Sequence, residues 1–298
     1  MTIYAASLSA STPAAAQQGA TAILDAGFGG IVLNSPVQHE AWSALRKLLP
    51  KDSVKAIELF LPSPRSLRPG ESASFSAGAE SKTDRSENLA QARKTLEAVD
   101  QLGIPLVLVP MTRLDIAGLG RSYLEPTASP EQEQLSFRAE SVELRARMDS
   151  LLALLSFLLE QAERYATTIC LTPGNRPGEL PMVPETLACL KEFDGAPMGL
   201  WLDTRRLPAE LLAVPTIGRP APAAGPDLLS RLQGASIADE TTAGAACNPG
   251  QGIVPWDQIT SSIRKLPLLS INGDLEEGSR FLADLEEEEA SPGGLLDA

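Results

Sequence analysis

Acidic side chains stand within or directly after short apolar runs of the sequence, where they could take part in proton transfer. Glu58 lies inside one run, Asp203 ends another, and Asp239 and Glu240 close a third. Burial or a nearby like charge raises the pKa of a carboxylate into the range useful for acid–base work. Neighbouring strand residues point to opposite faces, so Asp239 and Glu240 are not expected to pair. We therefore take Asp203, Glu58 and Asp239 as candidate catalytic residues and Glu240 as a candidate substrate-binding residue.

Each carboxylate also has a structural interpretation. A buried carboxylate is costly unless it is paired, so Glu58 should have a cationic or hydrogen-bonding partner nearby whatever its role. Asp203 is followed closely by Arg205 and Arg206, and either of these or another loop arginine could form an ion pair with it. The sequence leaves both interpretations open.

Arginines follow the same apolar runs. Arg113, Arg176, Arg205 and Arg206 could gather at one end of the strands and bind a phosphate or carboxylate through paired hydrogen bonds. The alternative is that they neutralise the neighbouring carboxylates. We take Arg113, Arg176 and Arg206 as candidate substrate-binding residues. The only histidine, His39, stands on an expected helix, so no Ser-His-Asp or Cys-His arrangement is indicated.

The elements that must position these residues alternate along the chain. Short β-branched runs are separated by longer segments with helical spacing, and this alternation is typical of a parallel sheet built from βα units. Eight units predict a single (β/α)8 barrel, an α/β fold with outer helices. The expected strands are Ile3–Leu8, Gly30–Asn34, Val54–Leu61, Ile104–Pro110, Thr168–Thr172, Met198–Asp203, Ala235–Asp239 and Leu266–Ile271.

Turn residues and proline mark the expected helices and the loops after the strands. In such a barrel the loops after strands build the active-site face, so the long ones carry the functional interest. Helices are expected at Pro13–Ala26, with Thr12 as N-cap, and at Pro36–Leu49, Ser86–Leu102, Pro130–Tyr165 and Asp227–Leu232. The long connections after strands are Pro62–Arg85, Met111–Ser129 and Pro173–Pro184.

Composition favours one globular domain. With 298 residues, 43% of them hydrophobic, the chain can bury one substantial core. The formal net charge is −13, but residues 274–298 hold nine acidic residues against the single Arg280, so most of the excess is local. We expect a barrel domain over residues 1–285 and an acidic flexible tail over residues 286–298.

Several partners and compartments are disfavoured. No apolar run approaches the roughly 18 residues that span a bilayer, and no secretory leader is apparent, so we expect a cytoplasmic protein without membrane contact. No basic stripe is present, which disfavours nucleic acid. Cys170, Cys189 and Cys247 are far apart, so neither a disulfide framework nor a cysteine zinc site is indicated. A homo-oligomer stays open.

Residues on the later strands resemble a known family. The segment Gly199–Thr204 is similar to the sixth strand of xylose isomerase-like sugar phosphate isomerases and epimerases, which ends in Asp-Thr. The segment Pro249–Trp256 resembles their Pro-Gly-x-Gly sequence followed by an aromatic residue at the start of the seventh helix. The run Ala56–Phe60 and the entry Leu102–Pro105 fit as well. The resemblance implies the barrel fold already expected.

The resemblance also implies a divalent ion held by a carboxylate ending strand five, the Asp of strand six, a His on strand seven and a carboxylate on strand eight. Thr172 stands near the first place, Asp203 keeps the second, Ser236 and Ile237 fill the third, and Asn272 follows the fourth strand. Neutral Thr and Asn cannot replace two carboxylate charges around an ion. We therefore expect no metal ligands and no cofactor, with Mn, Mg, Zn or Co left open, and take Thr172 and Asn272 as candidate substrate-binding residues.

Two functions follow from these expectations. The first is a barrel that binds, isomerises or epimerises a small polar molecule, such as a sugar or sugar phosphate, without the usual metal centre. The second is a non-catalytic barrel that serves as a small-molecule binding or protein-interaction module. The fold alone does not choose between them, because barrels of this kind host unrelated chemistries.

Overall fold

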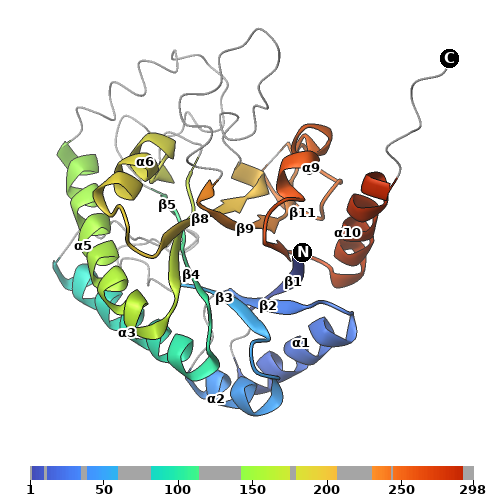
Figure 1. Ribbon diagram of the computed structural model, residues 1–298, viewed down its shortest axis with the longest axis horizontal. Helices are drawn as coiled ribbons and strands as arrows, with labels where there is room; N and C mark the ends of the chain where they lie inside the picture. Colours follow the sequence, from blue (N-terminus) through green and yellow to red (C-terminus); the bar gives the residue numbers. More distant parts are fainter. Residues whose placement is uncertain are drawn as a thin grey trace, which may run out of the picture.

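Eight parallel strands close into a barrel in the computed structural model (Figure 1), which describes residues 2–9, 12–34, 39–59, 82–113, 142–174, 179–206, 230–242 and 244–290. Around the barrel the strands follow the order β1, β12, β9, β8, β6, β4, β3, β2, and every neighbouring pair is parallel. Their bounds are β1 Ile3–Leu8, β2 Gly30–Leu33, β3 Val54–Glu58, β4 Leu106–Val109, β6 Thr168–Leu171, β8 Met198–Asp203, β9 Leu232–Ile237 and β12 Leu268–Ile271.

The eight expected strands are these eight barrel strands, so the fold prediction is confirmed. The largest difference is at β9, which begins at Leu232 and not at Ala235. Leu232 pairs with Leu200 of β8 and is buried, so it cannot end the short helix expected over Asp227–Leu232. The rest of that expected helix, up to residue 229, lies outside the described residues.

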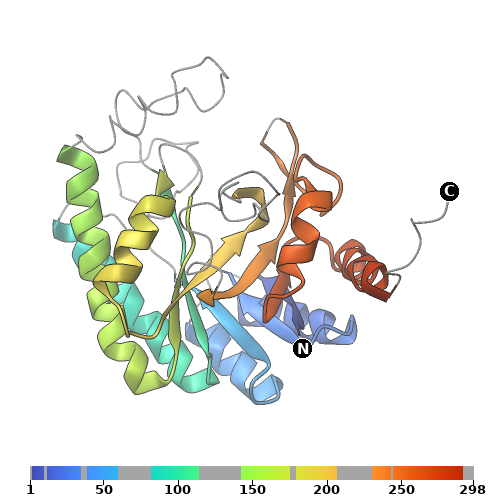
Figure 2. The ribbon, with the colours of Figure 1, turned by 45° about the horizontal axis from the view of Figure 1, so that its top comes forward.

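Helices lie on the outer side of the strands, as Figure 2 shows from a second direction. The helix α1 begins as expected, because Thr12 caps it by accepting a hydrogen bond from the Ala15 N–H at 3.2 Å and Pro13 is its first residue. The described helices are α1 Pro13–Asp25, α2 His39–Leu48, α3 Lys82–Leu102, α5 Val142–Tyr165, α6 Val183–Glu192, α9 Trp256–Ile263 and α10 Leu275–Ala290.

Parts of several expected segments lie outside the described residues. These are the start of the second helix, residues 60–61 of the third expected strand, most of the connections Pro62–Arg85 and Met111–Ser129, residues 175–178 of the connection Pro173–Pro184, the first part of the helix expected from Pro130, and residues 291–298 of the expected tail. The run of four glutamates at 286–289 belongs to α10. None of the helices in the described ranges is long and apolar enough to cross a membrane.

Apolar side chains fill the barrel interior before the ends of the strands, and we call this group of side chains the plug. It is formed by strand residues that point inward and pack against each other, away from the larger cluster between strands and helices. Side chains two residues apart on a strand share a face, so the residue that follows each plug residue by two also points inward. The plug consists of Ala5, Val32, Ala56, Leu106, Leu108, Cys170, Trp201 and Leu268.

Gly234 makes room for the largest plug side chain. Trp201 and Gly234 are register partners on β8 and β9, and a Cβ built on Gly234 would lie 2.4 Å from the indole ring of Trp201 and 2.4 Å from the Leu268 carbonyl oxygen. Glycine is therefore the residue that lets the indole lie against the neighbouring strand. The indole N–H donates to the Ser236 hydroxyl at 2.8 Å, so the buried ring keeps a polar partner.

Two small antiparallel sheets stand after barrel strands. Thr112–Arg113 (β5) pairs with Glu179–Leu180 (β7), and Asp239–Glu240 (β10) pairs with Ala246–Cys247 (β11). Both sheets belong to the end of the barrel at which the strands finish, which we call the mouth. They organise the loops in which the functional residues were sought.

Candidate functional site

Polar side chains begin where the plug ends. On six strands the inward position two residues after a plug residue is polar, and these positions form a ring at the mouth: Ser7, Asn34, Glu58, Thr172, Asp203 and Ser270. Register pairing places Asp203 beside Ser236 and Ser236 beside Ser270 on three adjacent strands. The Ser270 hydroxyl lies 3.1 Å from the hydroxyl of Ser7. The mouth therefore presents hydroxyl and carboxylate groups above an apolar floor.

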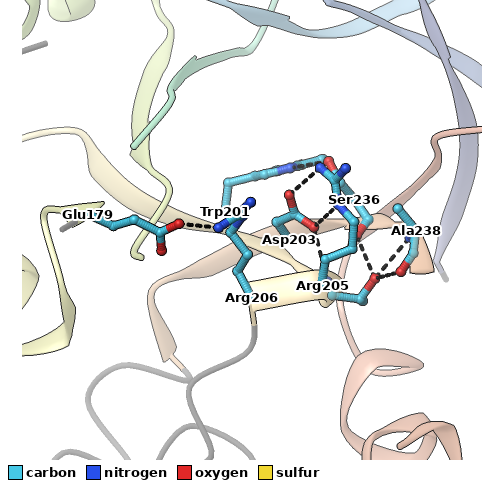
Figure 3. Close-up of polar contacts among 8 residues, drawn as sticks. Glu179, Trp201, Asp203, Arg205, Arg206, Ser236 and Ala238 are labelled. Carbon is cyan, nitrogen blue, oxygen red and sulfur yellow. Dashed lines mark hydrogen bonds and ion pairs between the residues drawn. The ribbon is translucent and has the colours of Figure 1, made fainter. Parts of the chain in front are cut away.

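Asp203 is held by an arginine that lies two residues further along the chain (Figure 3). The Nε of Arg205 donates to Asp203 Oδ1 at 2.9 Å, and its Nη2 donates to Oδ2 at 2.6 Å. The backbone N–H of Arg205 donates to Oδ1 as well, at 3.0 Å. Both carboxylate oxygens therefore accept hydrogen bonds from one guanidinium, a geometry that arginine provides and lysine does not. Of the arginines considered as partners of Asp203, Arg205 is the one that binds it.

A short 3-10 turn, Thr204–Arg206 (η1), sets this geometry. The hydroxyl of the buried Thr204 accepts from the Ala238 N–H at 2.9 Å and lies 2.5 Å from the Ala238 carbonyl oxygen (Figure 3). These contacts fix the turn after β8 to the segment after β9. The guanidinium of Arg205 is thus placed by the backbone and not by the side chain alone.

Glu58 faces Asp203 and Arg205 from β3. Burial, and then the charge of Asp203, raise the pKa of Glu58, while the charge of Arg205 lowers it; the outcome is a pKa of about 7. Within the ranges that the structure describes, Glu58 forms no hydrogen bond or ion pair, so its expected partner is present only as the nearby charge of Arg205. A carboxylate with this pKa can both accept and return a proton near neutrality.

Asp239 organises the loop that resembles the family's Pro-Gly-x-Gly segment. Its carboxylate is fully buried and accepts from the backbone N–H groups of Gly250 at 3.1 Å, Gly252 at 3.0 Å and Val254 at 3.0 Å, and from the Trp256 indole at 2.9 Å. Burial raises the pKa of Asp239, but these bonds and one from its neighbour's N–H outweigh it, so the pKa is lowered. A carboxylate saturated in this way is a weak proton acceptor.

The same loop is held from its other side by α10. The Nε2 of Gln251 donates to Glu277 at 2.8 Å, and Asn248 donates to the same carboxylate. The rings of Trp256 and Phe281 meet edge to face with centroids 4.7 Å apart. The loop is therefore fixed between the end of β9 and the first turns of α10.

A second ion pair is buried between two of the loops at the mouth. Arg206 of η1 contacts Glu179 of β7, and both side chains are buried, with 6% and 2% of their surface exposed (Figure 3). The pair joins the loop after β6 to the loop after β8. Arg206 thus takes part in a buried internal contact and does not present an open guanidinium to solvent.

The remaining candidates are placed as follows. Thr172 is buried directly after β6, and its N–H donates to the Val109 carbonyl at 3.0 Å. Asn272 follows β12 and donates its N–H to the Ile237 carbonyl at 3.0 Å. Glu240 is buried in β10. The backbone of Arg113 lies in β5, while its side chain and all of Arg176 lie outside the described residues.

In the part of the chain that the structure describes, no group of three or more His, Cys, Asp and Glu side chains could hold an ion. Ile237 belongs to the core between strands and helices, so Ser236 is the inward residue at the end of β9.

A cavity of about 330 Å³ lies at the start of β3, lined by Val54 among others, and thus at the opposite end of that strand from Glu58.

Sequence reasoning missed Glu179 and the hydroxyl row on β9 and β12. Glu179 stands in a two-residue strand, which has no periodicity to detect, and its partner is 27 residues away. Ser236 and Ser270 could have been found by counting two residues onward from the inward apolar positions of their strands.

Solved structures of other proteins share the fold of this chain, although its sequence matches no family model. No protein-family model matches the sequence, and none of the curated proteins matches it either. Among solved structures, 3-keto-D-glucoside 4-epimerase YcjR from E. coli is 17% identical, with a TM-score of 0.62 over 96% of this chain and 100% of that chain. A xylose isomerase domain protein from Planctomyces limnophilus is 14% identical, with a TM-score of 0.58 over 96% of each chain.

A third solved structure is D-allulose 3-epimerase from Methylomonas sp. in complex with D-allulose. It is 14% identical, with a TM-score of 0.57 over 91% of this chain and 83% of that chain. At such identities the likeness shows the fold and not the activity. The chain therefore has the fold of the xylose isomerase-like barrels, as its sequence predicted.

Proposed function

We propose that the barrel mouth binds a small sugar and moves a proton on it without a divalent ion, with Glu58 as the acid–base group. The observation that carries this proposal is the position of Glu58, an inward-facing carboxylate beside the Asp203–Arg205 pair, and its raised pKa of about 7 supports it. Neighbours in fold that act on sugars, including the epimerase solved with D-allulose, support sugar as the substrate class.

The proposed reaction needs one proton acceptor that also returns the proton. Ionised Glu58 takes a proton from the carbon beside a carbonyl group, and the bond electrons move to form an enediolate. Protonated Glu58 then returns the proton to the former carbonyl carbon. The hydroxyl proton of the first carbon passes to the former carbonyl oxygen, and the new carbonyl group forms at the carbon that lost its proton. A pKa near the working pH favours both halves of this transfer.

The number of available acid–base groups bears on the product. A proton shift between adjacent carbons on one face needs a single group, whereas inversion at one carbon needs a second group on the opposite face. The oxygens of Asp203 are occupied by Arg205 and those of Asp239 by the loop. The described residues therefore favour aldose–ketose isomerisation over epimerisation, with Glu240 as the remaining carboxylate for the latter.

The family's metal does not fit the residues at its expected positions. Thr172 and Ser236 carry no charge, Asn272 is an amide, and Asp203 is engaged by a guanidinium. A divalent ion of this type requires several anionic or imidazole donors at about 2.0–2.5 Å. We propose that Thr172, Asn272 and Glu240 instead contact the hydroxyl groups of the substrate, with Arg113 and Arg176 reaching it from the loops.

Exchange of substrate hydrogen tests this function. D-allulose and D-tagatose are incubated in D2O with chelator-treated protein, and loss of the proton beside the carbonyl is followed by NMR. Wild-type protein and an exposed control, Glu97→Gln on α3, should exchange this proton, and Glu58→Gln should not. Stoichiometric metal in the purified protein, with exchange abolished by the chelator, would overturn the metal-free mechanism.

A non-catalytic binding module is the second candidate, and one observation favours it. The charges of Asp203 and Glu179 are already matched by Arg205 and Arg206, as expected of groups that hold a scaffold. Saturable binding of a sugar without any hydrogen exchange, unchanged by Glu58→Gln, would select this alternative.

A further inference from the structure

One guanidinium lies among carboxylates from three different strands at the mouth. Arg205 contacts Asp203 of β8 directly, and the charges of Glu240 of β10 and Glu58 of β3 act on it as well. The hydrogen bond to Asp203, the charge of Asp203 and those of the two glutamates raise the pKa of Arg205, although burial lowers it. The field at this point therefore favours a positive charge.

The position of the guanidinium is built into the fold. Its residue follows Asp203 by two, its own N–H closes onto the same carboxylate, and Thr204 ties the turn to Ala238. The pair is largely shielded, with 25% of the Arg205 side chain and 12% of the Asp203 side chain exposed. A fixed bidentate pair in such a place resists exchange with solvent ions better than an exposed ion pair does.

We infer that Arg205 is the resident cation of the barrel mouth and takes the place that a divalent ion would need on Asp203. The Arg205 guanidinium donates to both carboxylate oxygens of Asp203, at 2.9 and 2.6 Å. An ion could therefore bind this carboxylate only by displacing the guanidinium. A guanidinium keeps its charge at all physiological pH values and cannot be removed by a chelator. The mouth is thus supplied with a positive charge from the chain itself.

This inference has a catalytic consequence that rests on the proposed function. When Glu58 removes a proton beside a carbonyl group, negative charge develops on the carbonyl oxygen. The N–H groups of Arg205 that do not face Asp203 could donate hydrogen bonds to this oxygen and stabilise it. The enediolate would then be stabilised by hydrogen bonds from a permanent cation.

Binding of Mn²⁺ tests the inference without any activity assay. Wild-type protein, Arg205→Ala and the control Arg231→Ala, which breaks only the exposed pair with Asp194, are titrated with Mn²⁺ and the free ion is measured by EPR. We expect one saturable ion in Arg205→Ala, bound about tenfold or more tightly than by wild type or the control, because the carboxylates lose their cation. Adding Asp203→Asn to Arg205→Ala should abolish that binding.

Two results would overturn the inference. One is a folded Arg205→Ala protein that binds Mn²⁺ no better than wild type does. The other is a wild-type protein that binds one Mn²⁺ through Asp203, shown by loss of the ion in Asp203→Asn. If Arg205→Ala does not fold, Arg205→Gln, which keeps most of the side-chain volume, is titrated with Mn²⁺ in its place, and the same two results would overturn the inference. Absence of sugar exchange in wild type would refute the proposed function and leave the Mn²⁺ result unaffected.

Discussion

Replacing Glu58 by glutamine should stabilise the protein at alkaline pH and leave its stability almost unchanged in acid. Burial and the charge of Asp203 raise the pKa of Glu58 from 4.5 to about 7. The folded state therefore holds this proton more tightly than the unfolded state does, and the free energy of unfolding falls as the pH rises between these two values. Glutamine has no proton to lose, so the variant lacks this decline.

The size of the effect follows from the shift in pKa. The difference between the two pKa values, at about 1.4 kcal/mol for each unit, gives about 3 kcal/mol once Glu58 is fully ionised in both states. Partial exposure of the side chain makes this an upper limit, and we expect a gain of about 2–3 kcal/mol above about pH 8.

Urea unfolding followed by circular dichroism at about pH 5 and about pH 8.5 measures this gain. The control is Glu97→Gln, which removes an exposed carboxylate from α3 and should change the free energy of unfolding by less than about 0.5 kcal/mol at either pH. A difference between Glu58→Gln and wild type that is equal at both pH values, or larger in acid, would refute the reasoning.

Three other substitutions test contacts around the mouth and in the plug. Asp239→Ala leaves four backbone N–H groups and an indole without their acceptor and should cost about 3–5 kcal/mol, with faster amide hydrogen exchange confined at first to the loop it holds. Glu179→Gln should cost about 3–5 kcal/mol in urea unfolding, because a buried guanidinium loses its charge partner, and adding Arg206→Met should recover part of that loss; equal values for the single and double variants would contradict this. Gly234→Ala should lower the free energy of unfolding by about 1–3 kcal/mol and lower the thermal midpoint with it. Gly29→Ala, where the nearest neighbour atom is 3.6 Å from the added Cβ, should not.

The sequence predicted the barrel because each barrel strand is a distinct apolar run followed by a helix or a long loop. All eight runs are barrel strands, and β1 and β8 have the predicted bounds. The two-residue strands of the mouth were not predicted, since two residues carry no alternation and their pairing depends on where the loops meet. The start of β9 was placed too late because Gln233 and Gly234 interrupt the apolar pattern.

The sequence predicted where the residues of the candidate site lie better than it predicted which groups they contact. Glu58 and Asp203 point inward at the ends of their strands because each follows a plug residue by two positions. The contact of Arg205 with Asp203 could be foreseen, because they are only two residues apart. The donors around Asp239 could not, because they come from a loop whose course depends on α10 as well as β9.

The separation of the plug from the polar ring makes this barrel a convenient scaffold for protein engineering. The side chains that fill the lower interior, Trp201 and Leu268 among them, are one layer away from the inward positions that face the mouth. Ser236 must keep an acceptor for the Trp201 indole, but exchanging Ser7 or Ser270 would change the chemistry of the open end without opening a void beneath it. A small library at these two positions could be screened for new ligands while the packing that holds the eight strands together is left intact.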